Sequence, residues 1–272
     1  MNNHSQNGKR KKILLTNDDG IHASGLKALY QELIQLGDVY VVAPAQQQSG
    51  VGLSVTYRAP LMVHEVKKEE KHWGWAVHGS PADCVKLGIL EFCQGVPDYI
   101  VSGINSGANT GLHVLYSGTV AAAIEGSFFG VTSFALSKST TEKPDYHNTA
   151  KHAVKLISQL IESDIPEGSL WNINFPSSQF DEPKGTKLVS LGLHRHSDIL
   201  EKRHDLRGQP YYWSGLVPEM SRHSKLANAE DELTDVHELA DGYITITPLN
   251  FDMTDRAQVT DPYVQQIIES LD

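Results

Sequence analysis

The stretch ILLTNDDGIHASGL, residues 13–26, constrains the fold of this chain more than any other part. Its first three residues, Ile13 to Leu15, form the short apolar run of a strand buried in a parallel sheet. An acidic turn follows at once, and after it we expect a helix that is capped by Ser24 and stopped by Gly37. The apolar face of that helix comprises Leu26, Leu29, Tyr30, Leu33 and Ile34.

A second strand, residues 39–43, ends at Pro44 and completes a right-handed βαβ unit. Asp18 and Asp19 then lie at the carboxyl end of the first strand, where open α/β sheets bind ligands. Adjacent aspartates in a turn often serve only as a helix cap or an Asx-turn. The buried strand before this pair and Gly20 after it favour a functional role.

Composition excludes several classes of protein. With 272 residues, 40% of them hydrophobic, the chain can bury one large core without extra staples. Cys84 and Cys93 match neither a disulfide framework nor a thiolate metal site, so we expect them to be reduced and the protein to be cytoplasmic. We expect no membrane span and no signal peptide. A net charge of -10 argues against long nucleic acids, whereas a small phosphorylated ligand remains compatible if a cation accompanies it.

Further helices and strands continue the alternating pattern. Ser80, Pro81 and Asp83 form a strong helix start, followed by Val85, Ile89 and Phe92 as its inward face. Ser117 can cap another helix, whose inward face is Val120, Ile124 and Phe128. A third helix presents Ala150, Val154, Ile157 and Ile161. Buried strands are expected at residues 99–101, 133–137 and 170–175, so the sequence predicts an α/β fold with a mainly parallel sheet.

Three segments follow from these patterns. Residues 1–12 are basic near their end and are expected to be a disordered leader, with a polyanion-binding arm as the alternative. Residues 13–192 form the predicted core. Residues 193–272 are expected to project as hairpins, with one clear strand at 242–248 and a terminal helix. That helix has an apolar stripe, Val264, Ile267, Ile268 and Leu271, for which another subunit can supply a groove by arm exchange.

Three loops at the strand ends carry the chemistry. They contain Asn17 to Asp19, Ser49 with Gly50, and residues 105–119. The candidate ligands are hard oxygen atoms, which favour magnesium or manganese over zinc. Glycines and hydroxyl groups in the last two loops resemble an anion cradle, although Ser49 and Gly50 alone are more often a flexible turn. Histidines 22, 113, 194, 196 and 204 are individually more often surface or core residues than ligands, with a general acid as the minor alternative.

Electrostatics connects the two halves of this predicted site. At about 4 Å and an effective dielectric constant near 20, two unit negative charges repel by about 4 kcal/mol. An anion beside Asp18 and Asp19 would therefore be repelled unless a divalent cation lay between them. Such a cation can bridge carboxylates to phosphoryl oxygens and activate water. The combination favours metal-assisted hydrolysis of a phosphate ester.

With these residues assembled, the chain resembles the SurE family of survival-protein phosphatases, often described as 5′-nucleotidases. The motifs that carry the resemblance occur in that family's order: TNDDG with SGL, VVAPAQQQSGVG, GSPADCVKLG, DYIVSGINSGANTG, LYSGTVAAAIEG, WNINFP and GYITITPL. The resemblance implies a Rossmann-like three-layer sandwich with a carboxyl-terminal arm exchanged in a homodimer or homotetramer. It also implies hydrolysis of nucleoside 5′-monophosphates, with 3′-nucleotides and short polyphosphate as further substrates.

The resemblance also implies a set of site residues. One divalent metal ion per subunit, Mg²⁺ or Mn²⁺, would be held by Asp18, Asp19, Ser49 and Asn105. The expected catalytic residues are Asp18, Asp19 and Asn109. The expected substrate-binding residues are Asn17, Ser49, Gly50, Asn105, Ser106, Gly107, Asn109, Ser117, Gly118 and Thr119.

Two questions stay open at this point. The nucleophile can be a metal-activated water, which we favour, or an aspartate of the pair through a phosphoaspartyl intermediate. The chain can also be a nucleotide-sensing or dinucleotide-binding module without turnover. Against that alternative, the first turn is acidic and lacks the glycine fingerprint of dinucleotide-binding folds.

Overall fold

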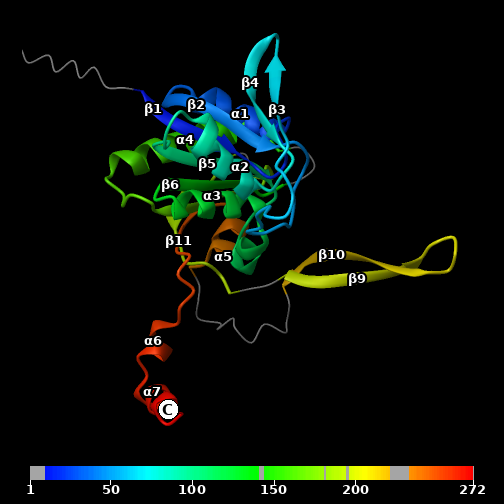
Figure 1. Cartoon of the computed structure of the whole chain (residues 1–272), viewed down its shortest axis with the longest axis vertical. Helices are drawn as coiled ribbons and strands as arrows, with labels where there is room; N and C mark the ends of the chain where they lie inside the picture. Colours follow the sequence, from blue (N-terminus) through cyan, green and yellow to red (C-terminus); the bar gives the residue numbers. More distant parts are fainter. Residues whose placement is uncertain (1–9, 141–143, 181, 194–195, 221–232, 272) are drawn as a thin grey trace, which may run out of the picture.

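The structure, a computed structural model, describes residues 10–140, 144–180, 182–193, 196–220 and 233–271. Figure 1 shows a layered core from which a long hairpin and the carboxyl-terminal segment project. The strands are β1 (Lys11–Thr16), β2 (Gly37–Pro44), β3 (Val63–Lys68), β4 (Lys71–Val77), β5 (Tyr99–Ser106), β6 (Thr132–Lys138), β7 (Leu170–Phe175), β8 (Thr186–Leu188), β9 (His196–His204), β10 (Pro210–Met220) and β11 (Ile244–Leu249). The α-helices are α1 (Ser24–Leu33), α2 (Pro81–Leu87), α3 (Gly118–Phe128), α4 (Tyr146–Glu162), α5 (Asp235–Ala240), α6 (Arg256–Val259) and α7 (Pro262–Glu269). A π-helical turn, Gly88–Phe92, extends α2, and a 3₁₀ segment, Gly111–Tyr116, precedes α3.

The central sheet has nine strands in the order β3-β4-β2-β1-β5-β6-β7-β11-β8. The six strands from β4 to β7 are parallel, whereas β3 pairs antiparallel with β4 and β11 pairs antiparallel with β7 and parallel with β8. The carboxyl ends of the parallel strands therefore meet at one edge of the sheet. The predicted α/β fold with a mainly parallel sheet is confirmed.

Helices cover both faces of the sheet, which confirms the three-layer sandwich (Figure 1). Successive residues of β1 point to opposite faces, as strand geometry requires. Ile13 and Leu15 pack in one cluster with the buried residues of α1 and α4. Leu14 packs on the other side, in a cluster with residues of α2 and α3. This two-sided burial explains why β1 is apolar at every position from Ile13 to Leu15.

Two predicted helix boundaries are wrong. The residue before α1 is Ala23, and Ser24 is already the first helical residue, so no side chain caps this helix. Gly37 does not stop α1 but begins β2. A Cβ atom there would lie 2.1 Å from the carbonyl oxygen of Lys11, so glycine is required by the close approach of β1. Ile34, expected on the buried face, is 42% exposed because the helix ends before it.

The other predicted caps are confirmed. Ser80 and Asp83 form a reciprocal capping box at the start of α2, and Ser117 accepts a hydrogen bond from the backbone N–H of Val120. Cys84 and Cys93 are free and buried. Phe128 is the exception to the predicted inward faces. It is 50% exposed, and its ring packs edge-on against Phe251 from the carboxyl-terminal segment.

The predicted leader and extension need correction. Strand β1 begins at Lys11, so the last residues of the leader join the sheet, while residues 1–9 lie outside the described part. The strand predicted at 242–248 does not project. It is β11, which pairs with β7 inside the central sheet and so covers an edge that β7 would otherwise expose.

The hairpin of β9 and β10 and the segment that carries α6 and α7 do project from the core, whereas α5 packs beside β11 and β7 (Figure 1). Strands β9 and β10 form an antiparallel hairpin with its own two-stranded sheet, as predicted. Helix α7 buries none of its residues within the chain, and its apolar stripe is exposed. Among the described helices, none has the length and apolar character needed to cross a lipid bilayer.

Candidate active site

The acidic turn after β1 is closed by its own first residue. Asn17 is fully buried, accepts a hydrogen bond from the N–H of Gly20 at 3.1 Å and donates one to the Gly20 carbonyl at 3.0 Å. Gly20 has a φ of 98°, a conformation that favours glycine. The side chain of Asn17 therefore holds the turn rigid, and the next two residues present their carboxylates from it.

Asp18 is almost completely buried, with 4% of its surface exposed. The hydroxyl group of Thr119 donates to its Oδ1 at 2.6 Å. A Cβ atom on Gly118 would lie 2.9 Å from the Cβ of Asp18, so only glycine lets α3 begin this close to the turn. Burial raises the pKa of Asp18 to about 6, and Asp19 adds to that shift while Thr119 opposes it.

Asp19 joins the other two loops to the turn. Its Oδ2 accepts from the backbone N–H of Ser106 at 3.1 Å, and its Oδ1 accepts from Gln47 at 3.3 Å. The same amide nitrogen of Gln47 donates to the hydroxyl of Ser49 at 2.9 Å. Burial raises the pKa of Asp19 as well. Residues from the ends of β1, β2 and β5 thus meet around two carboxylates.

Asn105 and Gly107 shape the loop after β5. The side-chain nitrogen of Asn105 donates to the carbonyl of Gly107 at 2.8 Å, which leaves its side-chain oxygen for another partner. The N–H of Gly107 donates to the Lys138 carbonyl at the end of β6. Asn105 therefore lies one residue from the N–H that binds Asp19, consistent with its predicted place among the ligands.

Asn109 points elsewhere. Its side chain donates to the hydroxyl of Ser137 at 2.8 Å, and its carbonyl accepts from the amide groups of Asn172 and Asn174. These contacts join the loop to β6 and β7, and none of them involves the acidic turn. The structure therefore gives Asn109 a supporting position, and its predicted catalytic role is a proposal.

Ser117 and Gly50 are placed by backbone geometry. The hydroxyl of Ser117 caps α3, so it serves the helix that brings Gly118 and Thr119 to Asp18. Gly50 has a φ of 72°, and a Cβ atom there would contact nothing within 4 Å. Its conformation, rather than a lack of space, requires glycine in the loop beside Ser49.

Three residues at this edge were missed from the sequence. Gln47 bridges Asp19 and Ser49, and the N–H of Gln48 donates to the carbonyl of Asp18 at 2.7 Å. Tyr146, the first residue of α4, hydrogen-bonds the Ser106 side chain near Asp19. The run of three glutamines before Ser49 was a usable signal for the first two. No pattern in the sequence marked Tyr146.

The donor set fits a hard divalent cation. No three histidine, cysteine, aspartate or glutamate side chains cluster as a metal site in the ranges that the structure describes. The predicted set instead combines two carboxylates with hydroxyl and amide oxygens, which suit Mg²⁺ or Mn²⁺ rather than Zn²⁺. The pKa values of Asp18 and Asp19 are not lowered by any neighbouring cation of the described chain. A buried acid next to a partly buried one, without a positive partner, is a site that a cation would stabilise.

Comparisons with known proteins agree with this picture. A family model described as "Survival protein SurE" matches residues 13–198. A 5′-nucleotidase SurE from Rhodopirellula baltica is 46% identical over 244 residues, covering 89% of this chain and 94% of that protein. One from Lawsonia intracellularis is 42% identical over 250 residues, covering 91% and 95%. A crystal structure of the SurE protein from Aquifex aeolicus has a TM-score of 0.76 at 34% identity, covering 96% of this chain and 99% of that one.

Proposed function

The chain belongs to the SurE family, and on that premise we propose that it is a 5′-nucleotidase, a metal-dependent phosphomonoesterase that hydrolyses nucleoside 5′-monophosphates. One observation carries the proposal beyond the family name. Asp18 and Asp19 are held together, largely desolvated, where the loops after β1, β2 and β5 meet. This arrangement suits a doubly charged cation with a phosphate ester beside it.

The proposed metal ligands are Asp18, Asp19, Ser49 and Asn105. A bound Mg²⁺ or Mn²⁺ would neutralise the phosphate oxygens and promote ionisation of water. The chain's own residues do the positioning. Thr119 fixes the orientation of the Asp18 carboxylate, and Gln47 holds Asp19 and Ser49 in one arrangement.

The proposed phosphate-binding residues are Asn109, Ser117, Gly118 and Thr119, with Gly107 and Ser106 beside them. The start of α3 supports Ser117, Gly118 and Thr119, because this helix places its first N–H groups next to Asp18. Asn109, Gly107 and Ser106 are proposed from the resemblance. Exposed Ser49 and Gly50 follow Gln48, whose backbone adjoins both the acidic turn and Gly118. The nucleophile is proposed to be water rather than Asp18 or Asp19. If water is the nucleophile, turnover of substrate with a labelled phosphate should leave no label on the protein. Labelled phosphate recovered on an aspartate would show instead that Asp18 or Asp19 is the nucleophile.

Metal removal tests the proposal directly. Thorough chelation should abolish release of phosphate from adenosine 5′-monophosphate, and added Mn²⁺ or Mg²⁺ should restore it. A second readout does not depend on activity: a cation at about 100 times its dissociation constant should stabilise the folded protein by about 2.7 kcal/mol. An Asp18→Asn variant should lose that thermal shift. Turnover that survives chelation would overturn the metal role, and binding of nucleotide without turnover would favour a sensing module.

Finer properties remain part of this proposal. Hydrolysis of 3′-nucleotides and short polyphosphate is proposed, because the site recognises a phosphoryl group by atoms that those substrates share. A homodimer or homotetramer is supported by the exposed apolar side chains of α7, with Ile267 at 46% and Ile268 at 58% exposure. Replacing both with aspartate should lower the molecular mass measured by light scattering. A cytoplasmic location is supported by two free, buried cysteines.

A further inference from the structure

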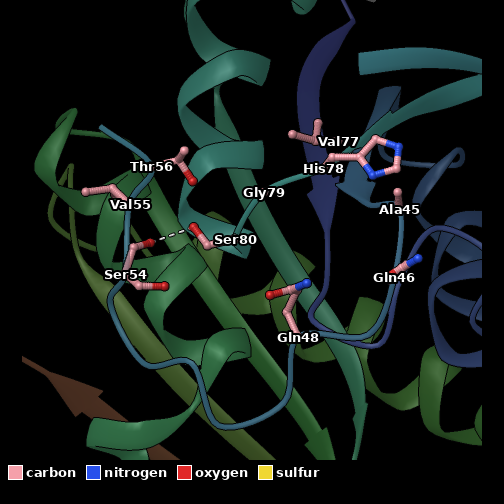
Figure 2. A pocket seen from close by; sticks show the side chains of 10 residues that line it. All are labelled: Ala45, Gln46, Gln48, Ser54, Val55, Thr56, Val77, His78, Gly79 and Ser80. Carbon is pink, nitrogen blue, oxygen red and sulfur yellow. Dashed lines mark hydrogen bonds between the residues drawn. The ribbon is translucent and has the colours of Figure 1, made fainter. Parts of the chain in front are cut away.

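A cavity of about 340 Å³ lies beside the acidic turn, outside the set of residues assigned so far (Figure 2). It opens where β2 and β4 end, next to the start of α2. Its volume is within the range of small-molecule sites. The lining residues are Ala45, Gln46, Gln48, Ser54, Val55, Thr56, Val77, His78, Gly79 and Ser80.

The cavity shares a wall with the acidic turn. Gln48 lines it, and the backbone N–H of the same residue donates to the carbonyl of Asp18 at 2.7 Å. The Gln48 carbonyl also lies 3.1 Å from the place of a Cβ atom on Gly118. The backbone of Gln48 therefore borders both the cavity and the proposed phosphate site, so the two are neighbours.

Three successive glutamines, Gln46 to Gln48, face either the acidic turn or the cavity. Gln47 turns to Asp19 and Ser49, whereas its neighbours Gln46 and Gln48 line the cavity. Figure 2 shows the amide group of Gln48 reaching toward the space between Gln46 and Ser80. In the described part of the chain, the amide groups of Gln46 and Gln48 make no side-chain hydrogen bond, so both can bind a ligand.

The lining chemistry defines the class of ligand. No lysine, arginine, aspartate or glutamate lines the cavity, so it is not built for a second phosphate or for a cation. The hydroxyl groups of Ser80 and Thr56 are already engaged, by Ser54 and Asp83 respectively. The groups that remain are two amides, the Ser54 hydroxyl, the His78 ring and the small apolar side chains of Ala45, Val55 and Val77. Amides pair with the donor and acceptor edge of a heterocyclic base, and apolar groups contact its faces.

We propose that this cavity is the nucleoside subsite, in which the amide groups of Gln46 and Gln48 form hydrogen bonds with the base of the substrate. The inference rests on the proposed function, because it assumes that the phosphoryl group binds at Asp18. It adds the residues that determine specificity. They make the protein prefer a nucleoside 5′-monophosphate to a sugar phosphate that lacks a base.

The test compares two substrates in three variants. The preference is the ratio of kcat/KM for adenosine 5′-monophosphate to kcat/KM for ribose 5-phosphate. Gln46→Leu and Gln48→Leu should each lower this ratio by about five- to tenfold, since a lost hydrogen bond to a neutral group has this effect. Gln47→Leu is the matched control. It should weaken hydrolysis of both substrates alike and leave the ratio unchanged, because its side chain faces Asp19.

A binding measurement separates this inference from the proposed function. Adenosine without phosphate, titrated by calorimetry, should bind the wild-type protein and the Asp18→Asn variant alike. It should bind the Gln46→Leu, Gln48→Leu double variant about tenfold or more weakly. If no phosphate ester is hydrolysed but this pattern is seen, the proposed function fails and the subsite stands. Equal adenosine binding by the double variant, or an unchanged substrate ratio in both single variants, would overturn the subsite.

Discussion

Two buried aspartates of this protein have opposite surroundings. Asp235, at the start of α5, is fully buried, and both of its carboxylate oxygens accept backbone N–H groups, from Gly111 at 3.0 Å and Gly192 at 2.8 Å. Asp18 is buried almost as deeply, but its side chain accepts the Thr119 hydroxyl rather than N–H groups of two distant loops, and a second acid follows it in the chain. One carboxylate is used to hold loops together. The other lies beside like charge.

The difference teaches how to separate structural from functional acids. Burial raises the pKa of both residues, so that shift alone does not distinguish them. What distinguishes them is the supply of hydrogen-bond donors. A carboxylate whose oxygens bind backbone N–H groups stabilises the fold, whereas a desolvated pair of acids destabilises it until a ligand arrives. Such strained groups are expected where activity is traded against stability.

The largest effect should come from Asp18→Asn. We expect turnover of nucleoside 5′-monophosphates to fall by about a thousandfold, because a charged ligand and its orientation are lost. The free energy of unfolding of the metal-free protein should stay within about 1 kcal/mol or rise, since repulsion with Asp19 disappears. Kinetic assays and urea denaturation measure the two quantities. Asp38→Asn, an exposed partner of Arg10, is the control and should leave turnover within about twofold.

Asp235→Ala should show the reverse of Asp18→Asn, with stability rather than turnover as the property that is lost. Removing this side chain leaves the buried N–H groups of Gly111 and Gly192 unpaired, so the free energy of unfolding should fall by about 3 kcal/mol. Asp241→Ala, an exposed residue that ends the same helix, should change it by about 0.5 kcal/mol or less. A stability loss at Asp235 no greater than that at Asp241 would break the comparison between the two acids.

Gly118→Ala should act on the site with a smaller effect. The new methyl group would lie 2.9 Å from the Cβ of Asp18 and 3.1 Å from the Gln48 carbonyl, so the acid must shift. A displacement of this kind can lower kcat/KM by up to about a hundredfold. The melting temperature should change little, because the turn can move toward solvent. Steady-state kinetics and a thermal scan on the same sample would check both expectations.

Gly126→Ala, in the same helix as Gly118, should have the smallest effect on activity. Its methyl group would meet Ile100 at 2.4 Å and the Ser133 hydroxyl at 2.5 Å, away from the acidic turn. Overpacking of this kind costs about 1–3 kcal/mol in the free energy of unfolding. Activity per folded molecule should be nearly unchanged. If Gly126→Ala lowered turnover as strongly as Gly118→Ala, the contact with Asp18 would not explain either variant.

Local chemistry explains the parts of the fold that were predictable. The capping box at Ser80 and Asp83 involves only neighbours in sequence, and the same holds for the cap at Ser117. Strand β7 was predicted at its observed bounds because the segment rich in apolar residues ends at Pro176. Predictions failed where distant segments decide the outcome. Gly37 was assigned to a helix end, but the neighbouring strand β1 is what requires glycine there.

The placement of β11 is a second example of the same limit. Its alternating residues marked it as a strand, but nothing local to it indicated which edge of a sheet it would cover. The pairing with β7 joins residues far apart in the chain, and that pairing moves β11 from the predicted extension into the core. Similarly, only the tertiary structure showed that the Asn109 amide group donates to Ser137 on β6, while its place in the site stays a prediction.

By itself, the sequence determined that two acids follow a buried strand, and that glycine- and hydroxyl-rich loops stand at the ends of other strands. Only the tertiary structure decided which of these groups touch. The Thr119 hydroxyl that orients Asp18 is 101 residues away, and the Ser106 N–H that binds Asp19 is 87 residues away. The physical reason is that burial follows from local pattern, whereas a hydrogen bond depends on distance and direction. Those are set only when separate strands pack into one sheet.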